Sequence, residues 1–95
     1  MIFNSSNVKN FSVKWYVYRD TTGGGATSLM EEGTFSGQYK VSTTTWTLAP
    51  GSSSGDNSLV TFDINPSTGQ VQYTSVSITG TPNVSEMKWQ LISSF

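Results

Sequence analysis

The chain has 95 residues, of which 35% are hydrophobic and 12% are charged, with a formal net charge of −1 at pH 7. One domain accounts for this length, and so weak a charge offers no field that would attract nucleic acid or an anionic membrane. Cysteine and histidine are both absent, which excludes disulfides, thiolate zinc sites, cysteine nucleophiles and a Ser-His-Asp triad.

The first predicted strand covers residues 8–19 and alternates strictly between two faces. Every second residue from Phe11 to Val17 is apolar, which is typical of the buried face of a strand. Tyr16 and Tyr18 lie in the opposite phase, where a half-solvated strand would carry only polar groups. We therefore expect another protein surface to cover the two tyrosines, and we favour a second copy of the chain as that cover.

The next stretch predicts more strand and a loop. Three glycines at 23–25 favour a hairpin loop, and residues 31–41 alternate again. The phase then shifts across residues 43–45, which indicates a bulge or a strand that passes to another sheet. Small and polar residues dominate segment 49–57, APGSSSGDN, so this segment is predicted as a flexible loop.

A hairpin around NPSTG is the strongest local prediction. Val60, Phe62 and Ile64 alternate before this turn, in which Pro66 fixes φ and Gly69 is free to adopt a positive φ. The stretch FDINPSTGQV also resembles a short segment of cadherin-type repeats, and this resemblance implies the same hairpin. A further change of phase near residues 74–75 indicates a bulge in the second arm.

The last stretch, VSEMKWQLISSF, places Met87, Trp89 and Leu91 on one face. No window shows helical periodicity, and turn signals separate five to seven short strands. The sequence therefore predicts an all-β fold, a small antiparallel β-sandwich, as a single β domain over residues 1–95; a small β-barrel is the alternative. Trp15, Val60, Phe62 and Ile64 are predicted core residues.

Carboxylates are too scattered for a catalytic pair. Glu31 and Glu32 are adjacent and face opposite sides of a strand, whereas glycoside hydrolysis needs two carboxylates about 5 to 10 Å apart across one cleft. Oxygen ligands between Asp56 and Asn65 do not match the spacing of a calcium-binding EF-hand loop. We expect no catalytic residue, no metal site and no cofactor, and a carboxylate-dependent glycoside hydrolase is the weakest alternative.

Aromatic residues are the candidate binding residues. The rings outnumber what one narrow core face accommodates, and exposed rings on a rigid sheet are buried by a partner or stack on sugars. The sequence predicts a non-enzymatic structural or assembly module that contacts further copies or other protein subunits; a carbohydrate-binding module is the alternative. The candidates are Tyr16, Tyr18, Tyr39, Trp46 and Trp89.

Thirteen Thr and sixteen Ser make nearly a third of the chain hydroxylated, a composition associated with extracellular, cell-surface and virion β proteins. The start, MIFNSSNVKN, lacks the basic and apolar segments of a signal peptide. No apolar run approaches the roughly 20 residues of a membrane span. We therefore expect the chain to work on a virion, an extracellular filament or a cell surface, without inserting into a membrane.

Overall fold

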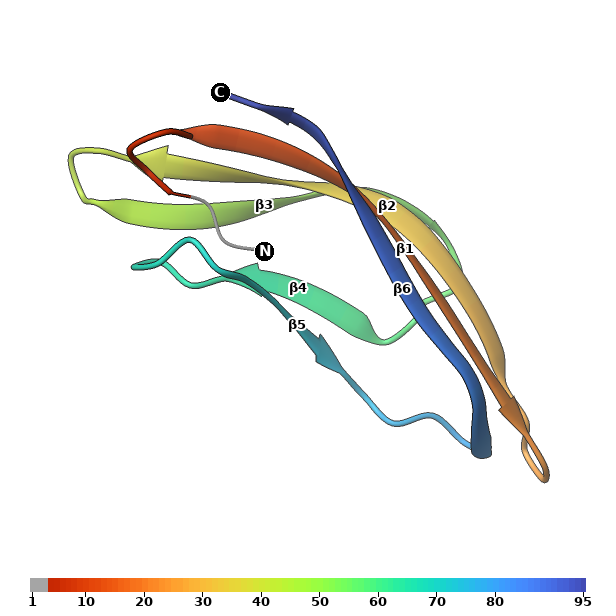
Figure 1. The fold of residues 1–95 in the computed structure, drawn as a ribbon. Helices are drawn as coiled ribbons and strands as arrows, with labels where there is room; N and C mark the ends of the chain where they lie inside the picture. Colours follow the sequence, from red (N-terminus) through yellow and green to blue (C-terminus); the bar gives the residue numbers. More distant parts are fainter. Residues whose placement is uncertain (1–3) are drawn as a thin grey trace.

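The computed structural model describes residues 4–95, in which six antiparallel β-strands form (Figure 1). Four strands make an open sheet in the order β3-β2-β1-β6, and β4 pairs with β5 in a separate hairpin. The all-β prediction of five to seven strands is confirmed. Because the described sheet ends at β3 and β6, the alternative of a closed barrel is wrong. The strands are β1 (Asn10–Thr22), β2 (Ser28–Lys40), β3 (Thr45–Gly55), β4 (Val60–Ile64), β5 (Val71–Ser75) and β6 (Thr81–Ser94).

The sheet is much longer than the hairpin. Its strands contain 11 to 14 residues, whereas β4 and β5 contain five each. At about 3.3 Å per residue a strand of β6 length spans about 46 Å, which accounts for a molecule of 52 × 21 × 16 Å. The hairpin spans about 17 Å by the same rule. It therefore covers only part of one face of the sheet, the inner face.

Three local predictions are wrong for reasons of strand pairing. Residues 43–45 do not carry a strand to another sheet; residues 43 and 44 belong to the β2–β3 turn, where Thr44 has a φ of 51°, and Thr45 begins β3 in the same sheet. Segment 49–57 is mostly strand, because β3 continues to Gly55 and pairs with β2 there. Instead of bulging near residues 74–75, β5 ends at Ser75.

The core lies between the inner face of the sheet and the hairpin. The phenyl ring of Phe62, on β4, lies 5.1 Å from the ring centroids of both Trp15 and Phe35. Trp15 and Ile64 are buried, while Val60 and Phe62 are partly buried against the same cluster. The core prediction for these four residues is therefore confirmed. The buried apolar side chains are Phe11, Val13, Trp15, Val17, Phe35, Trp46 and Ile64.

The predicted turn at NPSTG is confirmed, and it ties the hairpin to β3. The Asn65 side-chain oxygen accepts hydrogen bonds from the backbone N–H of Ser67 at 2.9 Å, and Gly69 adopts a φ of 75°. The backbone N–H of Trp46, on β3, donates to the carbonyl of Pro66 at 2.9 Å. This end of the hairpin is therefore fixed beside β3.

Ser58, which is 0% exposed, fixes the other end of the hairpin. Its backbone N–H and its hydroxyl both donate to Oε1 of Glu31, at 3.0 and 2.7 Å. The guanidinium of Arg19 donates to the Ser58 carbonyl at 2.8 Å. These bonds connect the segment before β4 to β1 and β2, so this end of the hairpin is held over the middle of the sheet, while the turn at the other end lies beside β3.

Candidate functional site

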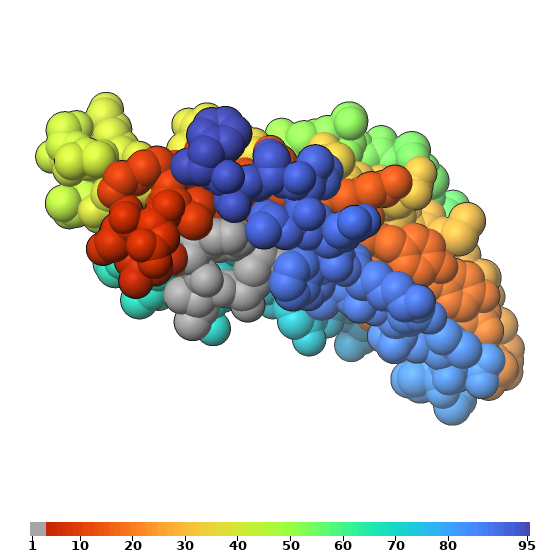
Figure 2. All heavy atoms as spheres, turned by 45° about the horizontal axis from the view of Figure 1, so that its top comes forward, coloured from red at the N-terminus to blue at the C-terminus, as the bar shows by residue number. Residues whose placement is uncertain are grey.

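The inner face of β6 is open, although it continues the core face. Met87, Trp89 and Leu91 pair with Val17, Trp15 and Val13 of β1, so they share the face that the hairpin partly covers. Their exposed fractions are 38, 54 and 41%. The prediction that these three side chains share one face is confirmed. We call Met87, Trp89 and Leu91 the β6 strip; Figure 2 shows that strand, in blue, running along the visible side of the molecule.

A cavity of ≈ 200 Å³ lies between β5 and two residues of the β6 strip, Met87 and Trp89. Trp89 lines it from β6 and Tyr73 from β5, while Phe35 and Phe62 close it on the core side. Tyr73 is 60% exposed, so both flanking rings present much of their surface to solvent. Its lining is chiefly aromatic and aliphatic, so the cavity suits an apolar side chain better than a polar ligand.

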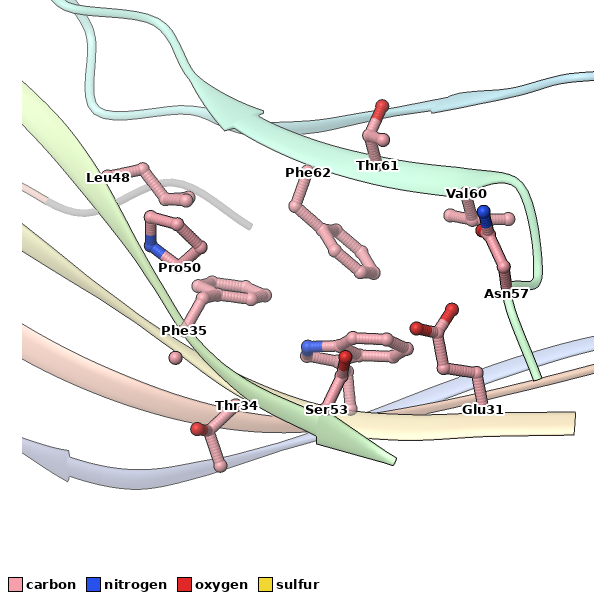
Figure 3. A pocket seen from close by; sticks show the side chains of 12 residues that line it. Glu31, Thr34, Phe35, Leu48, Pro50, Ser53, Asn57, Val60, Thr61 and Phe62 are labelled. Atoms are coloured by element: carbon pink, nitrogen blue, oxygen red, sulfur yellow. The ribbon is translucent and has the colours of Figure 1, made fainter. Parts of the chain in front are cut away.

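A second cavity, of ≈ 430 Å³, lies on the other side of the hairpin, between β3 and β4. Figure 3 shows Phe62 pointing into it toward Phe35, with Glu31 and Asn57 at one end. Oε1 of Glu31 already accepts two hydrogen bonds from Ser58. This cavity therefore combines an apolar floor with a polar rim.

Tyr16 and Tyr18 lie on the outer face of the sheet, opposite the hairpin, and both are partly buried. Tyr16 stands between Glu32 of β2 and Lys88 of β6, and Met30 lies beside Tyr18. The hairpin packs on the other face, so no second layer of the described chain covers them. That another copy covers them stays a prediction.

Tyr39 and Trp46 belong to the β3 edge of the core. Trp46 is 2% exposed, with its ring 5.8 Å from that of Phe11 and 5.3 Å from that of Tyr39. The ammonium of Lys9 lies 5.0 Å from the centroid of the Tyr39 ring. Trp46 therefore has no open ring face for a ligand, and of the sequence candidates Trp89 presents the most exposed ring beside a cavity.

Tyr73 is the site residue that sequence reasoning missed. It shares one strand face with Val71, which is the ordinary pattern of a core strand. Its exposure arises because β5 is an edge strand that faces the open β6 side, and no local pattern in the sequence reports that arrangement.

One ion pair marks the outer face of β6. Nζ of Lys88 lies 2.9 Å from Oε1 of Glu86, and the two side chains are 75 and 41% exposed. The hydrogen bond to this carboxylate, followed by its charge, raises the pKa of the Lys88 ammonium. Among residues 4–95 it is the only ion pair. Glu86 and Lys88 are also the only charged residues of the edge strand β6.

The oxygens considered for calcium are used in turns. Asp56 accepts a hydrogen bond from the backbone N–H of Met30 at 3.0 Å, and Asn65 caps its own turn. Within the described part of the chain, no three carboxylates, cysteines or histidines lie close enough to hold a metal ion. These side-chain oxygens therefore accept hydrogen bonds from backbone N–H groups.

Comparison with protein-family models, with curated proteins and with solved structures finds no match for the chain. Between residues 4 and 95 there is no helix long and apolar enough to cross a membrane. Functional inference consequently rests on the open β6 strip, the two cavities and the charges of the edge strand.

Proposed function

We propose that the chain is an incomplete β-sandwich that works as a non-enzymatic assembly module, and that another protein surface closes its open β6 side. The exposure of the β6 strip carries this proposal. In a sandwich two sheets bury their facing sides against each other, but here a two-stranded hairpin faces a four-stranded sheet. A partner surface would supply the missing part of the second layer.

Burial of the strip would provide much of the binding free energy. Removing apolar surface from water contributes about 25 cal/mol per Å², so each additional 100 Å² contributes about 2.5 kcal/mol. The strip lies on a hydrogen-bonded sheet, so its backbone is already ordered and the remaining entropy cost on binding is that of fixing its side chains. Exposed apolar patches of this kind mark interaction surfaces in small soluble proteins.

Free strand edges add directional contacts. β6 is the outer strand of the sheet on this side, and it leaves one row of backbone donors and acceptors unpaired in the described chain. Long apolar edge strands are templates for pairing with another chain. Main-chain pairing would determine orientation, while the β6 strip would supply the apolar contact.

The setting we propose is a virion, an extracellular filament or a cell surface. Assemblies in those places repeat one rigid module many times, and the chain offers a rigid sheet with an open side. The hydroxyl-rich composition and the absence of cysteine and histidine support a role that depends on contact surfaces.

Light scattering over a range of protein concentrations tests the proposal. We expect a mass above the 10.3 kDa of one chain at micromolar concentration. Trp89→Ser and Leu91→Ser should each lower that mass and keep the β circular dichroism spectrum, since both side chains are substantially exposed. The control Gln90→Ser, on the outer face of the same strand, should leave the mass unchanged. A wild-type monomer up to millimolar concentration would contradict the proposal.

A carbohydrate-binding module is the second candidate, and the cavity between β3 and β4 is the observation that favours it. Its apolar floor suits the C–H face of a sugar ring, and its rim of Glu31, Asn57 and Thr61 suits the sugar hydroxyls. Asn57→Asp keeps the oxygen that accepts from Leu59 and removes the amide donor. The test is a tryptophan fluorescence titration with hexasaccharides of glucose, galactose or N-acetylglucosamine. A saturable change that has a higher dissociation constant in Asn57→Asp would support this function. A titration with no fluorescence change would exclude those sugars.

A further inference from the structure

We infer that the partner on the β6 side is a second copy of this chain, and that the two β6 strands pair antiparallel about a two-fold axis at Met87. This inference rests on the proposed assembly function and specifies its partner and register. Three observations carry it: the free edge, the positions of two bulges, and the charges between them.

Two bulges delimit the regular part of the β6 edge. Asn83 is the extra residue between the pairs Asp20–Val84 and Thr21–Pro82, and Ile92 is the extra residue at the other end. Bulges bend a strand and end regular pairing. Between them, residues 84–91 run in unbroken register with β1. A two-fold axis at Met87 or at Lys88 keeps the longest paired segment inside this regular part.

Charge complementarity chooses between these two axes. Residues directly opposite in an antiparallel pair share a face, and like charges opposite each other destabilise the pair. An axis at Lys88 would place this ammonium against the same group of the partner subunit. An axis at Met87 places Glu86 opposite Lys88 of the partner subunit, and places Lys88 opposite the partner's Glu86. The register with its axis at Met87 therefore gives two favourable Glu86–Lys88 pairs between the two strands.

The inner face fits the same register. Trp89 comes to lie opposite Ser85 of the partner subunit, where a small side chain leaves room for the indole. Met87 faces the partner's Met87, so the two β6 strips meet along the axis. The two four-stranded sheets then continue into one another, and the edge that each chain leaves open is used by the other.

Charge exchange tests the register. Glu86→Lys and Lys88→Glu each turn both attractive pairs into repulsive ones, so each should weaken dimerisation about tenfold or more in sedimentation equilibrium. The double variant Glu86→Lys with Lys88→Glu should restore the wild-type dissociation constant. Glu32→Lys makes the same change of net charge on β2 and should leave dimerisation within about twofold of wild type. A double variant as weak as either single variant would overturn the register.

Cross-linking gives an independent readout, because the chain has no cysteine of its own. Opposed residues in an antiparallel pair have Cα atoms about 4.5 to 5.5 Å apart, within disulfide range. Met87→Cys should therefore form a disulfide-linked dimer on mild oxidation, and Ser85→Cys should not. Linkage at position 85 and not at 87 would place the axis elsewhere and overturn the inference while assembly stands. A wild-type chain that stays monomeric would overturn both the inference and the proposed function.

Discussion

Trp46 and Trp89 occupy comparable places at the two edges of one sheet, yet their environments differ completely. Trp46 lies on the edge strand β3 and Trp89 on the edge strand β6, and both belong to the inner face. The exposed fraction is 2% for Trp46 and 54% for Trp89. The comparison shows that strand pattern determines which face a side chain occupies, whereas the covering layer determines whether that face is buried.

Hydrogen bonds tie the hairpin to β3, β2 and β1 and leave β6 without an anchor. Pro66 is bonded to Trp46 at one end, and Ser58 is bonded to Glu31 and Arg19 at the other. In the described chain no hydrogen bond joins β5 to β6. A hairpin of two strands cannot cover four, so the side without these bonds stays open.

Replacing each tryptophan should produce the largest contrast. Trp46→Ala removes a buried ring that contacts Phe11 and Tyr39 and should lower the free energy of unfolding by about 3 to 5 kcal/mol. Trp89→Ala, measured at a concentration where the chain is monomeric, should cost less than about 1 kcal/mol. Urea titrations followed by circular dichroism measure both values. Equal losses would show that the two edges are equally covered.

The part of the sheet that the hairpin covers should tolerate no added side-chain volume at Gly37. A Cβ at this position would overlap the Phe11 ring, whereas Gly24, in the β1–β2 loop, has no heavy atom within 4 Å of the same group. Gly37→Ala should therefore cost about 2 to 3 kcal/mol, and Gly24→Ala less than about 0.5 kcal/mol. Thermal and urea unfolding of the pair check the difference. A neutral Gly37→Ala would mean that the covered side is loosely packed.

The polar anchor of the hairpin should contribute a smaller amount. Ser58→Ala removes the buried hydroxyl that donates to Glu31 and keeps the backbone bond, so the expected loss is about 1 to 2 kcal/mol. Ser67→Ala, at an exposed turn position, should stay within about 0.5 kcal/mol of wild type. If both variants unfold at the wild-type urea concentration, Ser58 does not hold the hairpin in place.

Calcium should have the smallest effect. Oxygens of Asp56 and Asn65 already accept backbone hydrogen bonds, so an ion would have to compete with the turns that they stabilise. Addition of millimolar calcium or of a chelator should change the melting temperature by less than about 1 °C, because only a ligand that binds the native state raises it. A rise of several degrees that chelator reverses would identify a site.

Period-two alternation was sufficient to place Trp15, Ile64 and the β6 strip on the inner face, and turn chemistry was sufficient to locate the hairpin at NPSTG. The Gly- and Ser-rich composition of residues 49–57 predicts a flexible loop. In the structure, pairing with β2 overrides this composition as far as Gly55. Trp46 and Trp89 show the same local pattern, so only the position of the hairpin separates a core residue from a candidate contact residue.

Amide hydrogen exchange of the two edge strands, measured by mass spectrometry at increasing protein concentration, tests the central claim most directly. If the β6 side is closed by a second copy, protection of residues 84–91 should rise as dimers form, because their outward amides gain partners. β3, the other edge strand, serves as an internal control and should keep the same exchange at every concentration. Protection that rises in β3 instead, or that stays constant in both strands while the mass increases, would contradict assembly through β6.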